Sequence, residues 1–377
     1  MSYRRLRAVC IKELHHITRD SRSLGMALAV PVMMLLLYGY ALSLDVDHIP
    51  TLIYDQDQTA ASRELIRQFE GSKYFEIRGY VAGYGEIERA IDRSRVLMGV
   101  VIPRNYSRDI GLGQKAPVQL LLDGSDSNTA SIALGYAENV VRSYSLTLRT
   151  EVMNQRAGEQ LAAPVDARLR VWYNSSLESK NYVVPGLIAV ILQIIAALLT
   201  SLTIAREWEM GTMEQLLSTP LRPMEIVLGK LLAYFAVGLA DAVIAVLVGL
   251  FVFQVPMRGS LGLLAVSICV FLFGALCWGI LISAVAKTQV LAYQMGIVSS
   301  FLPAFLLSGF VSSIETMPRV IQVITHIIPA RYVVTIMKGV FLKGIGWRLL
   351  WGELAFLAAY AVIVFALATR KMNQKLV

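Results

Sequence analysis

Residues 182–204 read YVVPGLIAVILQIIAALLTSLTI, a run of 23 residues without a charged side chain. An α-helix needs about 20 mostly apolar residues to cross the hydrocarbon core of a bilayer. Inside that core each backbone N–H and C=O must find a partner within the protein, and a helix meets this demand within a single segment. Residues 182–204 therefore predict a membrane-spanning helix.

Five more apolar runs of spanning length occur along the chain. They cover residues 24–44, 225–253, 261–286, 293–310 and 349–369. Charged residues make up 16% of the chain, hydrophobic residues 56%, and the mean hydropathy is +0.57. A soluble domain would have about 25% charged residues. We therefore expect an α-helical polytopic membrane protein with six transmembrane helices.

Residues 45–181, between the first two runs, have a different composition. Short β-rich segments at 51–54, 74–77, 97–102 and 118–122 alternate with helix-like segments. The helix-like segments cover residues 61–70, 86–93 and 128–156. This alternation predicts an inserted mixed α/β domain between helices 1 and 2.

The remaining segments connect or flank the spans. Residues 1–23 form a basic, amphipathic leader, predicted to lie along the membrane surface; a solvated basic leader is the alternative. Residues 205–224 form a polar loop and 370–377 a short tail. Residues 311–348 are broken by Pro318 and Pro329, so we expect an outer re-entrant or interfacial hairpin.

The charge distribution sets the expected orientation. The net charge is +8, and basic residues gather in the leader and in the tail. Basic residues beside spans favour the cytoplasmic side, so both termini are predicted cytoplasmic and the α/β domain extracytoplasmic. The basic residues of 311–348 oppose this assignment, but a seventh span at 321–342 would move the basic tail outside. The same pattern argues against a nucleic-acid partner.

The sequence contains no recognisable catalytic or metal-binding motif. Its three cysteines, Cys10, Cys269 and Cys277, lie outside the α/β domain, and the four histidines have no metal-ligand spacing. The phosphate-binding pattern G-x-x-x-x-G-K-[ST] is absent, because Gly229-Lys230 is followed by Leu231. We predict no catalytic residue, no metal site and no cofactor bound by this chain.

The loop after the second span and the first residues of the third, residues 205–230, read AREWEMGTMEQLLSTPLRPMEIVLGK. Acidic residues surround Trp208, Met213 and Leu216, and the pattern ends at Pro220, which predicts a short amphipathic helix. A helix with an exposed apolar face and acidic flanks can dock in a groove of a partner protein. The alternative is a loop helix that lies on the membrane.

This loop resembles the first cytoplasmic loop of type-2 ABC transporter permeases, the ABC-2 family, and in particular their bacterial multidrug-efflux subgroup. The resembling pattern is RE-x-E-x-GT-x-E-x-LL-x-TP. Three other stretches are similar to that subgroup: residues 100–130, residues 171–187, and residues 301–332 with the motifs FLPAFLLSGF, MP and IIPARY. Together they follow the order of the family over essentially the whole chain.

The resemblance implies a half-transporter in a bacterial inner (plasma) membrane. Two permeases, identical or paralogous, would pair with each other and with two cytoplasmic ABC ATPases that bind ATP-Mg. A periplasmic adaptor protein would extend the export route. The residues implied in coupling to the ATPase are Arg206, Glu207, Glu209, Gly211, Thr212, Glu214, Leu216 and Leu217. The implied activity is export of drugs or other amphiphilic compounds, or of lipids or polysaccharides.

Among the polar residues inside predicted spans, we single out three: Asp241, Gln193 and Gln294. A carboxylate near the middle of a span costs about 2.5–3.5 kcal/mol on insertion scales, so Asp241 is a candidate for the substrate path. The two glutamines are candidates for the same path or for hydrogen bonds between helices. A proton-coupled secondary transporter that uses Asp241, and a receptor or scaffold without transport activity, are the competing hypotheses.

Overall fold

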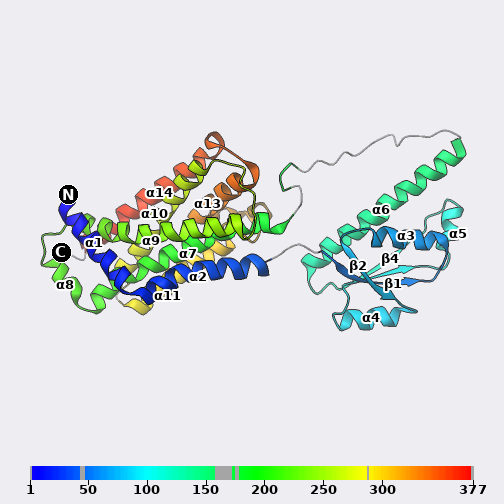
Figure 1. The fold of residues 1–377 in the computed structure, drawn as a ribbon, viewed down its shortest axis with the longest axis horizontal. Helices are drawn as coiled ribbons and strands as arrows, with labels where there is room; N and C mark the ends of the chain where they lie inside the picture. The colour runs from blue at the N-terminus through cyan, green and yellow to red at the C-terminus, as the bar shows by residue number, and fades with distance from the viewer. Residues whose placement is uncertain (1, 43–46, 158–171, 175–177, 287, 375–377) are drawn as a thin grey trace. The chain divides into compact units, whose positions relative to one another are not determined.

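The computed structural model describes residues 2–42, 47–157, 172–174, 178–286 and 288–374. They form two compact units (Figure 1), of which one is helical and holds residues 1–43 and 171–377, and the other is the α/β unit of residues 44–170.

The helical unit contains long helices joined by short ones. Its elements are α1 (Tyr3–Arg19), α2 (Ser21–Ala41), α7 (Ser179–Glu209), α8 (Thr212–Leu217), α9 (Pro223–Phe251), α10 (Leu261–Val285), α11 (Gln289–Leu306), η1 (Ile314–Thr316), α12 (Arg319–Thr325), α13 (Pro329–Lys338), the π-helical turn η2 (Gly339–Lys343) and α14 (Trp347–Gln374). Within the described residues, six of these helices are long and apolar enough to cross a membrane. They are α2, α7, α9, α10, α11 and α14.

Helix α7 is the centre of the helical unit. In its most apolar window 83% of the residues are buried, against 17% for α2 and 22% for α11. Small residues bring α10 and α11 close to it: Gly279 of α10 lies against Ala197, and Gly296 of α11 lies against Ser201. The buried face of α7 therefore packs on protein, while α2 and α11 leave most of their surface open.

Local signals explain where several helices begin and end. Ser260 and Thr288 cap α10 and α11, since their side chains accept hydrogen bonds from backbone N–H groups in the first turn. Gly211, after α7, and Gly309, after α11, have φ values of +71° and +79°, a conformation that glycine adopts without steric cost. Beyond Gly309 the chain forms η1 and then α12 and α13, which are bent by 87° relative to each other.

The helices that contain the second and fifth predicted spans have other bounds than those runs. The helix predicted at 182–204 continues to Glu209, because the charge of Glu207 is neutralised by lysines from other helices. The helix predicted at 293–310 instead covers Gln289–Leu306, because Gly309 leaves the helical conformation. Each apolar run otherwise lies largely within one helix.

The α/β unit contains a four-stranded sheet among its described residues. Its elements are β1 (Ile49–Asp55), α3 (Ala60–Glu70), β2 (Phe75–Tyr80), α4 (Tyr84–Asp92), β3 (Met98–Ile102), α5 (Tyr106–Gly111), β4 (Gln119–Leu122) and α6 (Ser127–Ala157). The strand order is β2-β1-β3-β4; β1 is parallel to β2 and β3, and β4 is antiparallel to β3.

Helices cover both faces of this sheet. Helices α3 and α6 lie on one face and α4 on the other, as Figure 1 shows. The core between them includes Phe69 of α3, Ile53 of β1, Val100 of β3 and Tyr144 of α6. Gly99 of β3 lies directly against Ile87 of α4, so the strand and the helix approach closely.

Candidate functional site

The first element of the candidate site is α1, which packs along the beginning of α9. A Cβ atom on Gly229 would lie 2.6 Å from Cγ1 of Val9, so the glycine permits the two helices to approach. The backbone N–H of Ser2 donates to Oε1 of Glu225 at 2.7 Å. The Arg5 guanidinium donates to the carbonyl oxygen of Pro220. The leader is thus a fixed part of this end of the helical unit.

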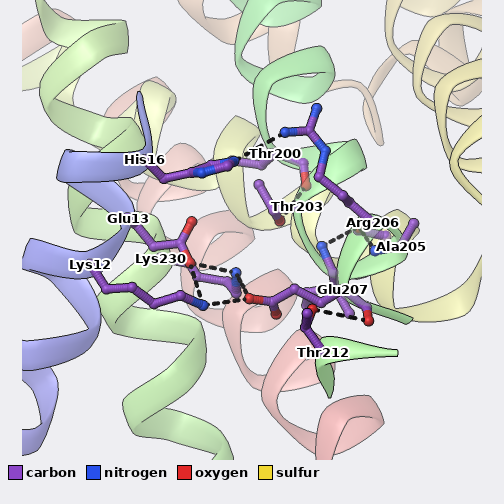
Figure 2. Close-up of polar contacts among 12 residues, drawn as sticks. Lys12, Glu13, His16, Thr200, Thr203, Ala205, Arg206, Glu207, Thr212 and Lys230 are labelled. Atoms are coloured by element: carbon purple, nitrogen blue, oxygen red, sulfur yellow. Dashed lines mark hydrogen bonds and ion pairs between the residues drawn. The ribbon is translucent and has the colours of Figure 1, made fainter. Parts of the chain in front are cut away.

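Four charged side chains from three helices meet between α1, α7 and α9 (Figure 2). Lys230 Nζ of α9 lies 2.9 Å from Oε1 of Glu13 and 3.0 Å from Oε1 of Glu207. Lys12 Nζ lies 2.9 Å from the same Glu207 oxygen. We call Lys12, Glu13, Glu207 and Lys230 the four-residue ion cluster.

The ion cluster is charge-balanced and mostly removed from water. The side chain of Lys230 is 2% exposed and that of Glu13 is 5% exposed, while that of Lys12 is 53% exposed. A buried charge of this kind is tolerated because each lysine faces a carboxylate. The end of α7 is therefore joined to α1 and α9 through charges that depend on one another.

The protonation of the cluster follows from these contacts. Burial raises the pKa of the Glu13 carboxyl, but Lys230, Lys12 and His16 oppose this, and the net pKa lies below its ordinary value. Burial lowers the pKa of Lys12, but the hydrogen bond and charge of Glu207 and the charge of Glu13 bring it above its ordinary value. Glu13 is consequently ionised, and Lys12 protonated, throughout the neutral range.

The same end of α7 is also joined to the first turn of α11. Oε2 of Glu209 accepts hydrogen bonds from the backbone N–H of Gln289 at 2.9 Å and from its side-chain amide at 3.2 Å. Nε of Arg206 lies 3.4 Å from Oε1 of Gln289, and Nη1 lies 3.2 Å from Nε2 of His16. Arg206, Glu207 and Glu209 thus bind three neighbouring helices.

Helix α8 follows directly after Gly211. Thr212 and Glu214 are exposed, and the hydroxyl of Thr212 donates to the backbone oxygen of Glu207 at 3.3 Å. Leu216 is half-buried, and the side chain of Leu217 lies outside the described residues. Met213 is buried among residues of α7, α9 and α10.

The structure differs from the single amphipathic helix that the sequence predicts for this loop. The segment is divided at Gly211 between the last turn of α7 and α8, and Met213 faces inward. Its exposed surface is mainly polar, with the exposed Met210 beside it. A partner that docks here would therefore meet polar side chains first.

The three residues predicted to line a substrate path have no hydrogen bond or ion pair with the ion cluster among the described residues, and they differ from one another in exposure. Asp241 of α9 is 1% exposed, and neither carboxyl oxygen has a hydrogen-bond partner in the described part of the chain. Gln193 of α7 is buried, and its Oε1 also has no partner there. Gln294 of α11 is exposed. Among the described residues, no hydrogen bond joins any two of these three side chains.

Sequence reasoning missed three members of the ion cluster: Lys12, Glu13 and Lys230. One signal was present, because Lys230 interrupts an otherwise apolar run and a charge there requires a partner. The identity of that partner was not visible, since Glu13 lies 217 positions earlier in the chain. Among the residues described, no group of three or more histidine, cysteine or acidic side chains is arranged to hold a metal ion.

The chain is similar to several known membrane proteins. It is 34% identical to "Probable multidrug ABC transporter permease YbhS" of Escherichia coli K12, over 100% of this chain and 98% of that protein. It is 34% identical to "Probable multidrug ABC transporter permease YbhR" of the same organism, over 98% of this chain and 100% of that protein. Similarity to "Inner membrane transport permease YhhJ" is 26% over 86% of the chain and 85% of that protein.

The family comparison agrees with the resemblance carried by the loop after α7. The model of the ABC-2 family of transporter proteins matches residues 22–370, from the second residue of α2 to a point within α14. The match therefore covers nearly all of the six helices of spanning length, and it includes the α/β unit as well as the helical unit. The chain belongs to the ABC-2 family of transporter proteins.

Proposed function

We propose that this chain is the membrane-spanning permease of an ATP-driven exporter whose ATPase is a separate cytoplasmic polypeptide. The observation that carries the proposal is the set of polar contacts at the C-terminal end of α7. Arg206, Glu207 and Glu209 join this end to α1, α9 and α11. A force applied at α8 would therefore move several helices together.

The proposed docking surface for the ATPase is the exposed side of α8 and its flanks. Thr212 and Glu214 are exposed there, as are Gln215 and Met210. Gly211 links this surface to α7, and the four-residue ion cluster links α7 to the rest of the unit. The ATP-Mg would be bound by the ATPase, and this chain would contribute no catalytic residue.

The proposed assembly contains two permeases, identical or paralogous, and two ABC ATPases in a bacterial inner membrane. The α8 end faces the cytoplasm with both termini. The end of α14 packs in the same cluster as Met213 of α8, which supports placing the tail at this end. The α/β unit would then be periplasmic, where an adaptor protein could dock on it.

The proposed cargo is a drug or another amphiphilic compound. Support comes from the names of two relatives in Escherichia coli, which are called probable multidrug ABC transporter permeases. Asp241, Gln193 and Gln294 are the proposed polar residues of the path. Gln294 is exposed on an otherwise apolar helix, and an amide that faces hydrocarbon without a partner is costly. We infer that it faces the second permease or the path.

Co-purification from the native membrane tests this proposal. The tagged chain should bring down a P-loop ATPase, and the reconstituted complex should show ATP-dependent dye export. Glu214→Lys, which reverses an exposed charge on α8, should reduce both, because it changes the docking surface without touching the buried core. Glu64→Lys on α3 is the matched control and should reduce neither. A full complement of ATPase on the Glu214→Lys chain would contradict the assigned docking surface.

The alternative is a proton-coupled transporter that uses Asp241, and the buried, unpartnered carboxyl of Asp241 is the observation in its favour. Transport by the chain alone, driven by a proton gradient and lost in Asp241→Asn, would support that alternative. A further candidate is a lipid or polysaccharide exporter of the same family. Competition of dye export by lipids or glycans would distinguish this cargo class from drugs.

A further inference from the structure

Near the N-terminal end of α7, the carbonyl oxygen of Gly309 accepts two hydrogen bonds, one from α7 and one from α13. The hydroxyl of Tyr182, in the first turn of α7, donates to the carbonyl oxygen of Gly309 at 3.2 Å. Nζ of Lys338, at the end of α13, donates to the same oxygen at 2.8 Å. Because a carbonyl oxygen has two lone pairs, these two donors saturate it.

The two donors also contact each other. Nζ of Lys338 lies 3.4 Å from the centroid of the Tyr182 ring, which is the geometry of a cation–π interaction. No ion pair with a carboxylate is formed by Lys338 within the described residues. The Tyr182 ring and the Gly309 oxygen are therefore the contacts that hold the Lys338 amine. We call Tyr182, Gly309 and Lys338 the Gly309 latch.

The latch fixes a turn that would otherwise be free to change. Gly309 has a φ of +79° and lies three residues beyond Leu306, the last residue of α11, in the turn that leads to η1. Phe310, the next residue, is buried against Gly186 of α7; a Cβ atom on Gly186 would lie 2.7 Å from its ring. The turn between α11 and η1 is thus held against α7 by polar contacts on one side and by an aromatic ring on the other.

Helix α7 joins this latch to the ion cluster. Both Tyr182 and Glu207 belong to the helix Ser179–Glu209, which contains Pro185 in its second turn and is helical throughout. At 1.5 Å per residue, the two residues are about 37 Å apart along its axis. A rigid helix that is anchored at both ends transmits displacement from one anchor to the other.

We propose that Tyr182 and Lys338 are positioning residues for export, which hold the turn at Gly309 against α7 in the resting transporter and release it when α7 moves. The proposal rests on the proposed function, in which an ATPase moves the Glu207 end. Release of the latch then lets the end of α11 separate from α7. Neither residue needs to touch the cargo for this role.

Ser308 provides a probe of the latch that does not require ATP. The residue is 1% exposed, and its hydroxyl has no hydrogen-bond partner in the described part of the chain, so Ser308→Cys removes no hydrogen bond seen there. In a background with Cys10, Cys269 and Cys277 replaced, a water-soluble maleimide should label this thiol slowly. Adding Lys338→Met should accelerate labelling about tenfold, since it removes a hydrogen bond from a charged donor.

Matched variants separate the latch from general loosening. Lys338→Arg keeps a cationic donor and should restore slow labelling. Tyr182→Phe keeps the ring below the ammonium but loses the hydroxyl, and should accelerate labelling by a smaller factor. Lys343→Met removes a nearby exposed lysine whose charge repels that of Lys338, so it should not accelerate labelling. Melting temperature and elution volume report whether each variant remains folded.

The outcomes distinguish the latch from the transporter assignment. Unchanged labelling in folded Lys338→Met and Tyr182→Phe, or equal acceleration in Lys343→Met, would overturn the latch. In the complex with its ATPase, ATP and vanadate should accelerate labelling of Ser308→Cys. If no ATPase is found, the proposed function fails while acceleration by Lys338→Met still supports the contact. If an active ATPase is present and ATP leaves labelling unchanged, the role of the latch in export is overturned.

Discussion

Lys230 is surrounded by carboxylates that come from two other helices, Glu13 of α1 and Glu207 of α7. An ammonium in this position is stable only while both partners are present, because a buried charge without a counter-ion carries its full desolvation cost. The exposed Lys12 completes the charge balance from the solvent side. Single substitutions in the cluster should therefore differ strongly in effect.

Lys230→Met should lower the free energy of unfolding by about 3–5 kcal/mol, because it leaves two buried carboxylates without their shared cation. Lys12→Met is the matched control; its side chain is 53% exposed, and it should cost about 1 kcal/mol or less. Unfolding by SDS titration in detergent micelles measures both. Equal losses of unfolding free energy in the two variants would contradict the expectation that the buried lysine contributes more than the exposed one.

The stability of the α1 contact should depend on pH through Glu13. The pKa of Glu13 is depressed in the folded chain, so its contribution is complete above the ordinary value of 4.5 and is lost as the pH falls through the folded pKa. Unfolding free energy measured between pH 7 and the acid limit should show this loss. Glu13→Gln should remove that part of the acid dependence, and an unchanged profile in the variant would assign it to other groups.

At the scale of elements, close packing depends on small residues between helices. Gly279 of α10 lies against Thr200 and the backbone of Ala197, and the Thr200 hydroxyl donates to the backbone oxygen of Leu276 at 2.9 Å. The hydroxyl of Ser283 accepts hydrogen bonds from the backbone N–H groups of Ile204 and Ala205, each at 2.9 Å. The α7–α10 contact is consequently both tight and hydrogen-bonded.

Gly279→Ala should destabilise the helical unit by about 1–3 kcal/mol, because the added methyl overpacks the contact. A Cβ atom there would lie 2.6 Å from the carbonyl oxygen of Ala197, which belongs to a helix backbone. Gly352→Ala on α14 is the control, since a Cβ atom there meets nothing within 4 Å. Melting temperatures of both variants in the same detergent test the difference. A Gly279→Ala variant as stable as the control would mean that α7 and α10 can move apart freely.

The element scale also shows where sequence reasoning succeeds and where it stops. Spanning length and apolar content are properties of one segment, so six helices could be predicted without knowing their neighbours. The extension of α7 to Glu209 could not be predicted in this way, because the buried charge of Glu207 is compensated by Lys230 and Lys12 from other helices. The inward direction of Met213 was likewise invisible, since it is set by packing against α9 and α10.

At the scale of the whole molecule, the chain consists of two units that differ in where their apolar residues lie. The helical unit presents apolar surface on α2 and α11, which suits hydrocarbon. The α/β unit buries its apolar residues between a sheet and helices, as a water-soluble domain does. Its alternation of strands and helices was visible in the sequence, whereas the strand order β2-β1-β3-β4 follows from pairings between distant segments.

The α/β unit should fold without the helical unit. A fragment of residues 47–157 should give a cooperative thermal transition by circular dichroism, because the unit has its own core. Phe69→Ala should lower the stability of the fragment by about 3–5 kcal/mol, since Phe69 is 0% exposed and its loss leaves a cavity. A fragment that melts without cooperativity would show that the unit needs its neighbour.

The long sequence separation in the ion cluster has a consequence for biosynthesis. Glu13 leaves the ribosome 217 residues before Lys230. At about 5–20 residues per second, this interval lasts roughly 10–40 s. During that time Glu13 has Lys12 beside it, but its buried partner Lys230 has not yet been synthesised. Helix α1 can therefore pack in its final position only after α9, the third hydrophobic segment, has begun to enter the membrane. The docking of α1 is thus a late step of assembly.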